Sequence, residues 1–208
     1  MWYPSYDFDI PLFGIDLISL GRNRSLIGID FIPLRPQDQQ YSSKYISPYL
    51  EHIRPKHDQL HDKMTKRFYD GESIFSEYML LGKFKCQPDI ETVVKPAVRD
   101  YMNAYMNLVS DYIGSDISTP QNDRNKYIYT ASTEESQSDP RVLNKLHPRS
   151  RYDQRREVKK LQQEYDVYNA KKDPAIGIFN SYFGTSWSDS YVHDFLFDLS
   201  RADLDNFP

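Results

Sequence analysis

The sequence is poor in cysteine, in glycine motifs and in long apolar runs. Its 208 residues include one cysteine, Cys86, which excludes a disulfide framework within the chain, a four-cysteine zinc site and a Cys-ligated iron–sulfur cluster. No stretch approaches the roughly 18 apolar residues of a membrane-spanning helix, so we expect no membrane segment. The glycines form neither G-x-G-x-x-G nor G-x-x-x-x-G-K-[ST], so the sequence offers no dinucleotide fingerprint and no P-loop.

An excess of basic residues is also lacking. The chain has 26 Lys and Arg against 30 Asp and Glu, a net charge of −4, so nucleic acid is not expected as the main partner. The start of the chain carries the acids Asp7 and Asp9 with no apolar run after them, which does not fit a signal peptide. A single thiol fits a reducing compartment.

Aromatic residues are abundant. They make up 14% of the chain, with 17 tyrosines against 2 tryptophans. Tyrosine and phenylalanine bury large areas, so a hydrophobic fraction of 39% can still build a core. At roughly 150 residues per domain, the length predicts one domain over residues 1–208.

Three segments are typical of β-strands. Residues 8–20 and 26–34 are rich in β-branched and aromatic residues, and the Gly/Asn-containing turn between them predicts an antiparallel hairpin. Residues 74–85 form a third candidate. Since side chains alternate along a strand, Asp16 should share a face with Gly14 and Ile18.

Helices are predicted after the hairpin and in the second half of the chain. Residues 90–113 have apolar residues at helical spacing, with Pro96 expected in the first turn or at a kink. Residues 114–150 are polar and aperiodic, which predicts a long mobile loop or insertion. Shorter helical pieces are expected at 41–53 and 56–67, and further helices at 151–171, from Asp173 to about Gly184, and at 188–199 with Ser186 or Ser188 as its N-cap.

Two aspartates are candidates for proton-transfer chemistry. Asp16 lies in the middle of an apolar strand, where desolvation would raise its pKa toward that of a proton donor at neutral pH. The plain alternative is an acid on the solvent face of a half-buried sheet. Asp173 precedes Pro174, and its plain alternative is a helix N-cap.

Two other groupings have functional and structural interpretations. His57 and His61 are spaced to share one helical face and could bind zinc, but no third ligand is specified, and a solvated amphipathic segment is the favoured interpretation. A basic cluster in the acidic chain could dock an acidic protein, or form a solvated helix end balanced by neighbouring acids. This cluster includes Arg151, Arg155, Arg156 and Lys159.

Beyond these patterns, several segments resemble the ferredoxin-dependent bilin reductases, and the phycoerythrobilin-forming branch in particular. The resemblance covers most of residues 2–34, 68–113 and 150–200. It rests on the order and spacing of several motifs, which are Tyr3-Pro4, Asp9-x-Pro11-x-Phe13-Gly14-x-Asp16-Leu17, Ile29-Asp30-Phe31-x-Pro33-Leu34, Ile74-Phe75-Ser76-Glu77, Tyr165-Asp166-x-Tyr168-x-Ala170-Lys171-x-Asp173-Pro174-Ala175, Tyr182-Phe183-Gly184-x-Ser186-Trp187 and Val192-His193-Asp194-Phe195-Leu196-Phe197.

The resemblance implies an α+β fold, a three-layer α/β/α sandwich with a central antiparallel sheet and a linear tetrapyrrole between the sheet and the C-terminal helices. By position, Asp16 matches the family's central-pocket aspartate and Asp173 its second aspartate, both implied proton donors to a bilin radical. We expect Lys66 and Arg67 to hold the substrate's propionates, with solvated surface cations as the alternative. The family's N-terminal part has no counterpart before Trp2, so the domain is expected to be incomplete there.

The implied activity is reduction of 15,16-dihydrobiliverdin or biliverdin toward phycoerythrobilin. Electrons come one at a time from external ferredoxin, so no bound cofactor and no metal are expected, and the basic cluster gains weight as a ferredoxin-docking site. We expect a monomer with no nucleic-acid or membrane partner, in a plastid stroma or the cytoplasm of a photosynthetic cell. The alternative from another class is a non-catalytic bilin-binding or carrier protein.

Overall fold

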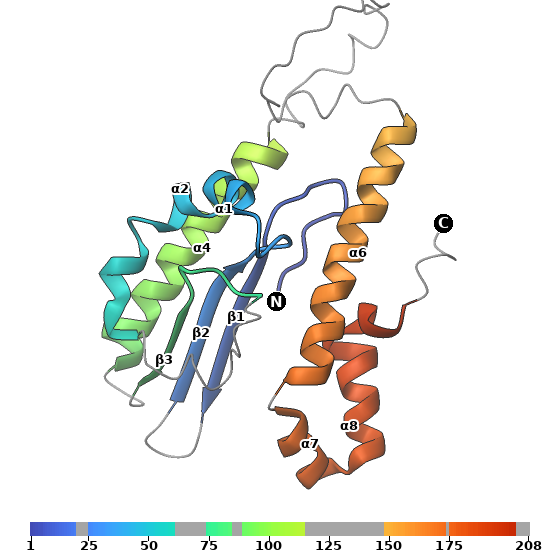
Figure 1. The fold of residues 1–208 in the computed structure, drawn as a ribbon. Helices are drawn as coiled ribbons and strands as arrows, with labels where there is room; N and C mark the ends of the chain where they lie inside the picture. The colour runs from blue at the N-terminus through green and yellow to red at the C-terminus, as the bar shows by residue number, and fades with distance from the viewer. Residues whose placement is uncertain (20–24, 61–73, 85–88, 115–147, 174, 203–208) are drawn as a thin grey trace, which may run out of the picture.

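The computed structural model describes residues 1–19, 25–60, 74–84, 89–114, 148–173 and 175–202 (Figure 1). Within them, a three-stranded sheet stands between two groups of helices, which confirms the predicted helix–sheet–helix layering. The first group consists of the helices between β2 and β3 and the helix that follows β3. The second group forms the C-terminal part of the chain. None of the helices in the described ranges is long and apolar enough to cross a bilayer.

The sheet has the strand order β1-β2-β3, with both pairs antiparallel. β1 (Leu12–Ser19) pairs with β2 (Ser25–Ile32) in one unbroken register, which confirms the predicted hairpin. β1 begins four residues later than predicted, directly after Pro11, because proline has no N–H to donate to a strand ladder.

The third strand is shorter than predicted. β3 (Leu80–Phe84) covers only the end of the expected 74–85 range. Residues 74–79 instead form an irregular segment in which the Met79 N–H donates to the Ser76 carbonyl at 3.2 Å. The Ser76 backbone N–H donates to the Asp30 carboxylate at 2.8 Å, so a side chain of β2 captures the group that a strand ladder would have used.

The helices between β2 and β3 are short. They are α1 (Gln39–Tyr45), α2 (Ser47–Leu50) and the 3₁₀ segment η1 (Arg54–Leu60), where one helix was expected at 41–53 and another at 56–67. Asp38 caps α1 by accepting the N–H groups of Gln40 and Tyr41. The rest of the second expected range lies outside the described residues.

The long helical segment after β3 confirms the prediction for residues 90–113. It consists of η2 (Ile90–Val94), α4 (Lys95–Val109) and η3 (Ser110–Gly114), with Pro96 in the first turn of α4 as expected. The aromatic face of α4 packs on one side of the sheet, where Tyr105 stacks on Phe13 with ring centroids 5.0 Å apart and meets Phe31 at 5.1 Å. The main core therefore lies between α4 and the sheet.

The C-terminal helices stand on the other side of β1 from α4 (Figure 1). They are α6 (Pro148–Lys172), α7 (Ala175–Phe183), α8 (Thr185–Tyr191), η6 (Val192–Leu196) and η7 (Asp198–Arg201). The loop expected over 114–150 is overestimated at both ends, because Gly114 belongs to η3 and α6 begins at Pro148. The remaining residues 115–147 lie outside the described ranges.

The predicted last helix is confirmed, but it runs over α8 and η6, about three residues earlier at both ends than the predicted 188–199. The chain turns at Gly184, whose φ of 84° is favourable only for glycine, and α8 begins at the next residue. Ser186 and Ser188 therefore lie inside α8 and cap nothing. The serine signals misled the prediction because the turn is made by backbone conformation and not by a side-chain cap.

Candidate active site

Asp16 lies in the middle of β1 on the sheet face turned away from α4. Antiparallel pairing places it directly opposite Gly28, and Gly14 pairs with Asp30 two residues along the same strand. Directly paired residues point to the same side of a sheet, and Phe13, which touches α4, has the opposite parity. The predicted face of Asp16 is therefore confirmed, and two glycines border it.

Asp173 lies between the end of α6 and the start of α7. Its backbone N–H continues the helix by donating to the Asn169 carbonyl at 2.8 Å, and its carboxylate accepts the Ala175 N–H at 2.8 Å. The N-cap interpretation from the sequence is thus confirmed for this side chain. A cap uses one carboxylate oxygen, so it leaves the other available for a different partner.

The charge of Asp173 affects the pKa of Asp16. Partial burial raises the pKa of Asp16, and the negative charge of Asp173 raises it further. Burial also raises the pKa of Asp173, against the opposing effect of its hydrogen bond from Ala175. The charge of Asp173, 157 residues further along the chain, therefore reaches Asp16, and both carboxyls hold protons more tightly than free aspartates.

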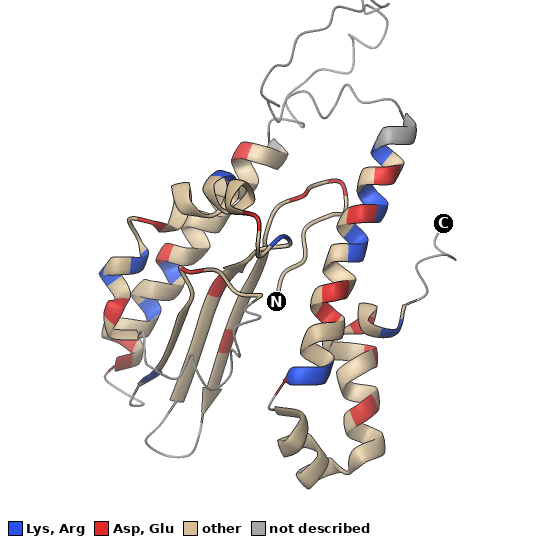
Figure 2. Cartoon of the chain, in the orientation of Figure 1, with Lys and Arg blue, Asp and Glu red and all other residues tan. Residues whose placement is uncertain are grey.

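The helices next to Asp173 expose an aromatic surface. α7 has no charged residue, as its uniform tan colour in Figure 2 shows, and buries no side chain fully. Rings follow one another along α7 and α8 with centroids 4.5 to 5.3 Å apart. Exposed apolar surface of this kind is a candidate binding region. Its most exposed members are Ile178, Tyr182, Phe183, Trp187 and Phe195.

Two further acids, Asp30 and Asp166, are buried against partners that the sequence does not identify. Asp30 is 2% exposed and accepts the backbone N–H and the hydroxyl of Ser76, and burial raises its pKa to about 7. Asp166 is fully buried in α6 and accepts the Tyr3 hydroxyl at 2.5 Å, and burial raises its pKa to about 6. The Tyr-Asp motif at 165–166 was the available signal for the second acid, but its partner lies 163 residues away.

The predicted basic cluster lies along the N-terminal half of α6. Arg151, Arg155 and Arg156 are exposed, and Arg155 donates to Asp7 at 3.1 Å. Lys159 differs from the expected surface cation, because it is only 5% exposed and its ammonium lies 5.8 Å from the centre of the Tyr6 ring. Lys66 and Arg67, the expected propionate ligands, lie outside the described residues.

The histidine pair does not form a described metal site. His57 is buried, and its Nε2 lies 2.9 Å from the Asp100 carboxylate, while His61 is outside the described residues. Among the residues that the structure describes, no group of three or more His, Cys, Asp or Glu side chains is placed to hold a metal ion.

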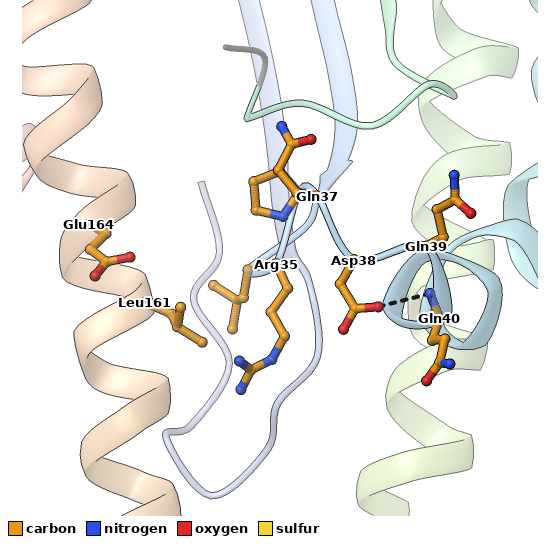
Figure 3. Close-up of a pocket in the computed structure, with 9 residues that line it drawn as sticks. Arg35, Gln37, Asp38, Gln39, Gln40, Leu161 and Glu164 are labelled. Carbon is orange, nitrogen blue, oxygen red and sulfur yellow. Dashed lines mark hydrogen bonds between the residues drawn. The ribbon is translucent and has the colours of Figure 1, made fainter.

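A separate open hollow of about 800 Å³ lies between α6 and the connection from β2 to α1 (Figure 3). Its lining is mixed, with Leu34 and Leu161 beside polar side chains, and neither Asp16 nor Asp173 takes part in it. Arg35 in the hollow is already bound to Asp9 at 3.0 Å and to Glu157 at 2.9 Å. This hollow is therefore a seam bridged by ion pairs and is distinct from the aspartate pair.

The family relationship follows from comparison with known proteins. Residues 1–198 match the model of the ferredoxin-dependent bilin reductase family. The chain belongs to this family. It is similar to the 15,16-dihydrobiliverdin:ferredoxin oxidoreductase of Nostoc punctiforme, at 33% identity over 196 residues, and to that of Gloeobacter violaceus, at 31% over 199 residues.

Each of these alignments covers 94% of this chain but only 65% of the relative, so the chain spans just under two thirds of the relatives' length. The fold is similar to the crystal structure of phytochromobilin synthase from tomato in complex with biliverdin, with a TM-score of 0.69 at 19% identity. That match covers 99% of this chain and 60% of the tomato chain, and it establishes the shared fold.

Proposed function

We propose that the chain reduces a linear tetrapyrrole, with electrons from ferredoxin and protons from Asp16 and Asp173. The observation that carries the proposal is the match of residues 1–198 to the ferredoxin-dependent bilin reductase family, and the raised pKa values of the two carboxyls on β1 and at the start of α7 support it. The family membership and the names of the relatives, which are 15,16-dihydrobiliverdin:ferredoxin oxidoreductases, support 15,16-dihydrobiliverdin as the substrate. Biliverdin is the second substrate to test, and phycoerythrobilin is the expected product.

The reaction adds two electrons and two protons across one double bond of the bilin. Ferredoxin delivers single electrons, so a substrate radical forms after the first delivery and is removed by the second. The protein must supply a proton near each reaction centre at the right moment. Carboxyls with raised pKa values suit this task because they keep a proton near neutral pH and give it up to a more basic, electron-rich bilin.

The surroundings of the pair suit a flat conjugated ligand. On the sheet side, Asp16 pairs with Gly28, so no side chain stands directly opposite the carboxyl on β2. On the helix side, α7 and α8 offer exposed aromatic rings. The combination would hold a tetrapyrrole by apolar contact and stacking while its polar edge meets the two acids.

The exposed arginines of α6 are the proposed docking site for ferredoxin. Arg151, Arg155 and Arg156 lie on one end of an otherwise mixed helix, and positive charge would steer an acidic electron carrier. We place the reaction in a photosynthetic cell, in its cytoplasm or its plastid stroma. The relatives named above are cyanobacterial.

The test is an anaerobic absorbance time course of the full chain with reduced ferredoxin and either bilin. We expect a shift to a shorter-wavelength product with 15,16-dihydrobiliverdin. Asp16→Asn and Asp173→Asn should bind the bilin and fail to complete the reduction, while Glu51→Gln, at an exposed acid after α2 and away from both aspartates and the docking arginines, should behave as the unaltered chain. A bound-bilin spectrum that never changes on addition of reduced ferredoxin would indicate a carrier and contradict the proposal.

A further inference from the structure

The segment before β1 connects the two parts of the molecule that carry the aspartates. Trp2 forms a two-way backbone bridge with Phe13, in which the Trp2 N–H donates to the Phe13 carbonyl at 2.9 Å and the Phe13 N–H donates back at 3.1 Å. Phe13 lies three residues before Asp16 on β1. The position of Trp2 is therefore fixed relative to the strand that carries Asp16.

The next residue is fixed to α6. The Tyr3 hydroxyl donates to Asp166 Oδ1 at 2.5 Å, and the other oxygen of the same carboxylate accepts the Leu199 N–H at 3.0 Å. Asp166 lies seven residues, or about two helical turns, before Asp173. One buried carboxylate thus joins the N-terminal segment, α6 and η7.

Two glutamines of α6 make further hydrogen bonds to the N-terminal segment and to the residues of and just after η7. The Gln162 side chain donates to the Pro4 carbonyl at 3.1 Å, and that of Gln163 donates to the Leu199 and Ala202 carbonyls at 3.0 and 2.8 Å. Consecutive residues 2 and 3 are therefore bound to opposite sides of the site, one to the sheet and one to the helix.

We propose that Tyr3 and Asp166 are positioning residues, which set the separation of the Asp16 and Asp173 carboxyls through the Trp2–Phe13 bridge on one side and α6 on the other. The inference rests on the proposed function for its catalytic consequence. Its structural part, the separation of the two carboxyls, can be measured without any substrate.

The decisive variant is Tyr3→Phe, which keeps the ring and removes the donor to Asp166. The control is Tyr101→Phe. Tyr101 is fully buried where Tyr3 is only half-buried, and its hydroxyl donates to the Tyr78 carbonyl at 2.6 Å, wholly within the part formed by the sheet and α4. Both variants lose one partly buried hydrogen bond of a tyrosine, so a merely stabilising role would leave the titration of Asp16 unchanged in both.

The first readout is the carboxyl titration of Asp16 followed by ¹³C NMR of the full chain. In Tyr3→Phe, α6 is no longer held to the N-terminal segment, Asp173 moves away, and the pKa of Asp16 should fall toward its ordinary value. The second readout is turnover of 15,16-dihydrobiliverdin, where we expect kcat to fall on the order of tenfold with a smaller change in KM, because misplaced proton donors slow the chemical step. Tyr101→Phe should leave both readouts as in the unaltered chain.

The outcomes separate this inference from the proposed function. A lower pKa of Asp16 in Tyr3→Phe but not in Tyr101→Phe supports the positioning role, even if the unaltered chain reduces no bilin, a result that would overturn the proposed function alone. An unchanged titration in folded Tyr3→Phe overturns the positioning role, whatever the turnover. If Tyr3→Phe fails to fold, Asp166→Asn, which has the same shape and weakens the same bond, decides by the same titration.

Discussion

The part formed by the sheet and α4 and the part formed by α6 to η7 are held together in different ways. The first encloses a continuous core with fully buried side chains such as Phe31, Leu80 and Tyr101, and nearly every residue of the main cluster comes from it. The second has a small cluster of three buried residues, Ala170, Val192 and Phe197, while much of its aromatic surface is exposed. Polar links, among them Tyr3–Asp166 and Arg35–Glu157, join the two parts.

This difference assigns the two parts different tasks. A rigid, well-packed sheet holds Asp16 at a fixed place, since core packing leaves few alternative arrangements. The helical part has exposed aromatic rings, and it carries Asp173 at the turn between α6 and α7. Apolar surface that the fold leaves uncovered is free to contribute to ligand binding, so we assign stability mainly to the first part and bilin contact mainly to the second.

The largest expected effect is on catalysis. Asp16→Asn should lower turnover by roughly 10²- to 10⁴-fold, the usual contribution of a proton donor, with little loss of stability because asparagine keeps the shape of this partly buried side chain. Steady-state kinetics with reduced ferredoxin, together with urea unfolding, measure both. Turnover within threefold of the unaltered chain would remove Asp16 from the chemistry.

The packing contrast predicts the next largest effect. Phe31→Ala should lower the free energy of unfolding by about 3–5 kcal/mol, because the ring is fully buried against Tyr101 and Tyr105. Phe195→Ala, at a ring 70% exposed on η6, should change it by no more than about 0.5 kcal/mol and weaken bilin binding instead. Equal losses in urea unfolding would show that the two parts are equally packed.

The pH dependence of stability should also differ between the parts. Because the folded chain holds a proton on Asp30 up to about pH 7, and the unfolded chain loses it near pH 4, the free energy of unfolding falls as pH rises between these values. The fall should be on the order of 4 kcal/mol for Asp30 and smaller for Asp166, whose pKa is about 6. Between pH 4 and 8, the free energy of unfolding of Asp30→Asn and Asp166→Asn should therefore vary less with pH than that of the unaltered chain. The difference should be clearest for Asp30→Asn.

The smallest expected effect comes from glycine in the helical part. Gly177→Ala should raise the free energy of unfolding by about 0.5–1 kcal/mol, because the added Cβ meets no atom within 4 Å in α7 and alanine favours a helix. In the sheet, Gly82→Ala should destabilise, since its Cβ would lie 1.8 Å from the Leu60 carbonyl oxygen. Thermal unfolding of the pair tests this, and a destabilising Gly177→Ala would mean that α7 is packed more tightly than described.

Local patterns predicted the elements that are built from neighbouring residues. The alternation in β1 and β2 gave the hairpin and the face of Asp16, and the helical spacing at 90–113 gave α4 with its flanking turns. The Asp-Pro pair at 173–174 predicted the start of α7, since an aspartate before a proline is a strong helix-start signal.

The features that local patterns did not predict are determined by contacts between residues far apart in the chain. β3 is short because Ser76 is taken by Asp30, 46 residues away, and no period in the 74–85 segment encodes that partner. Lys159 is covered and Asp166 is bound to Tyr3 because α6 folds back on the N-terminal segment. Pairing Asp16 with Asp173 needed the family resemblance, since neither residue's own surroundings in the sequence point to the other.

The most direct test of the central claim, that the two parts bring Asp16 and Asp173 to one site, is a ¹³C NMR titration of the Asp16 carboxyl in the unaltered chain and in Asp173→Asn. The charge of Asp173 is one of the causes that raise the pKa of Asp16, so the account predicts a lower pKa of Asp16 when residue 173 is neutral. An identical Asp16 titration in both proteins would mean that the two carboxyls do not share a site and would contradict the account.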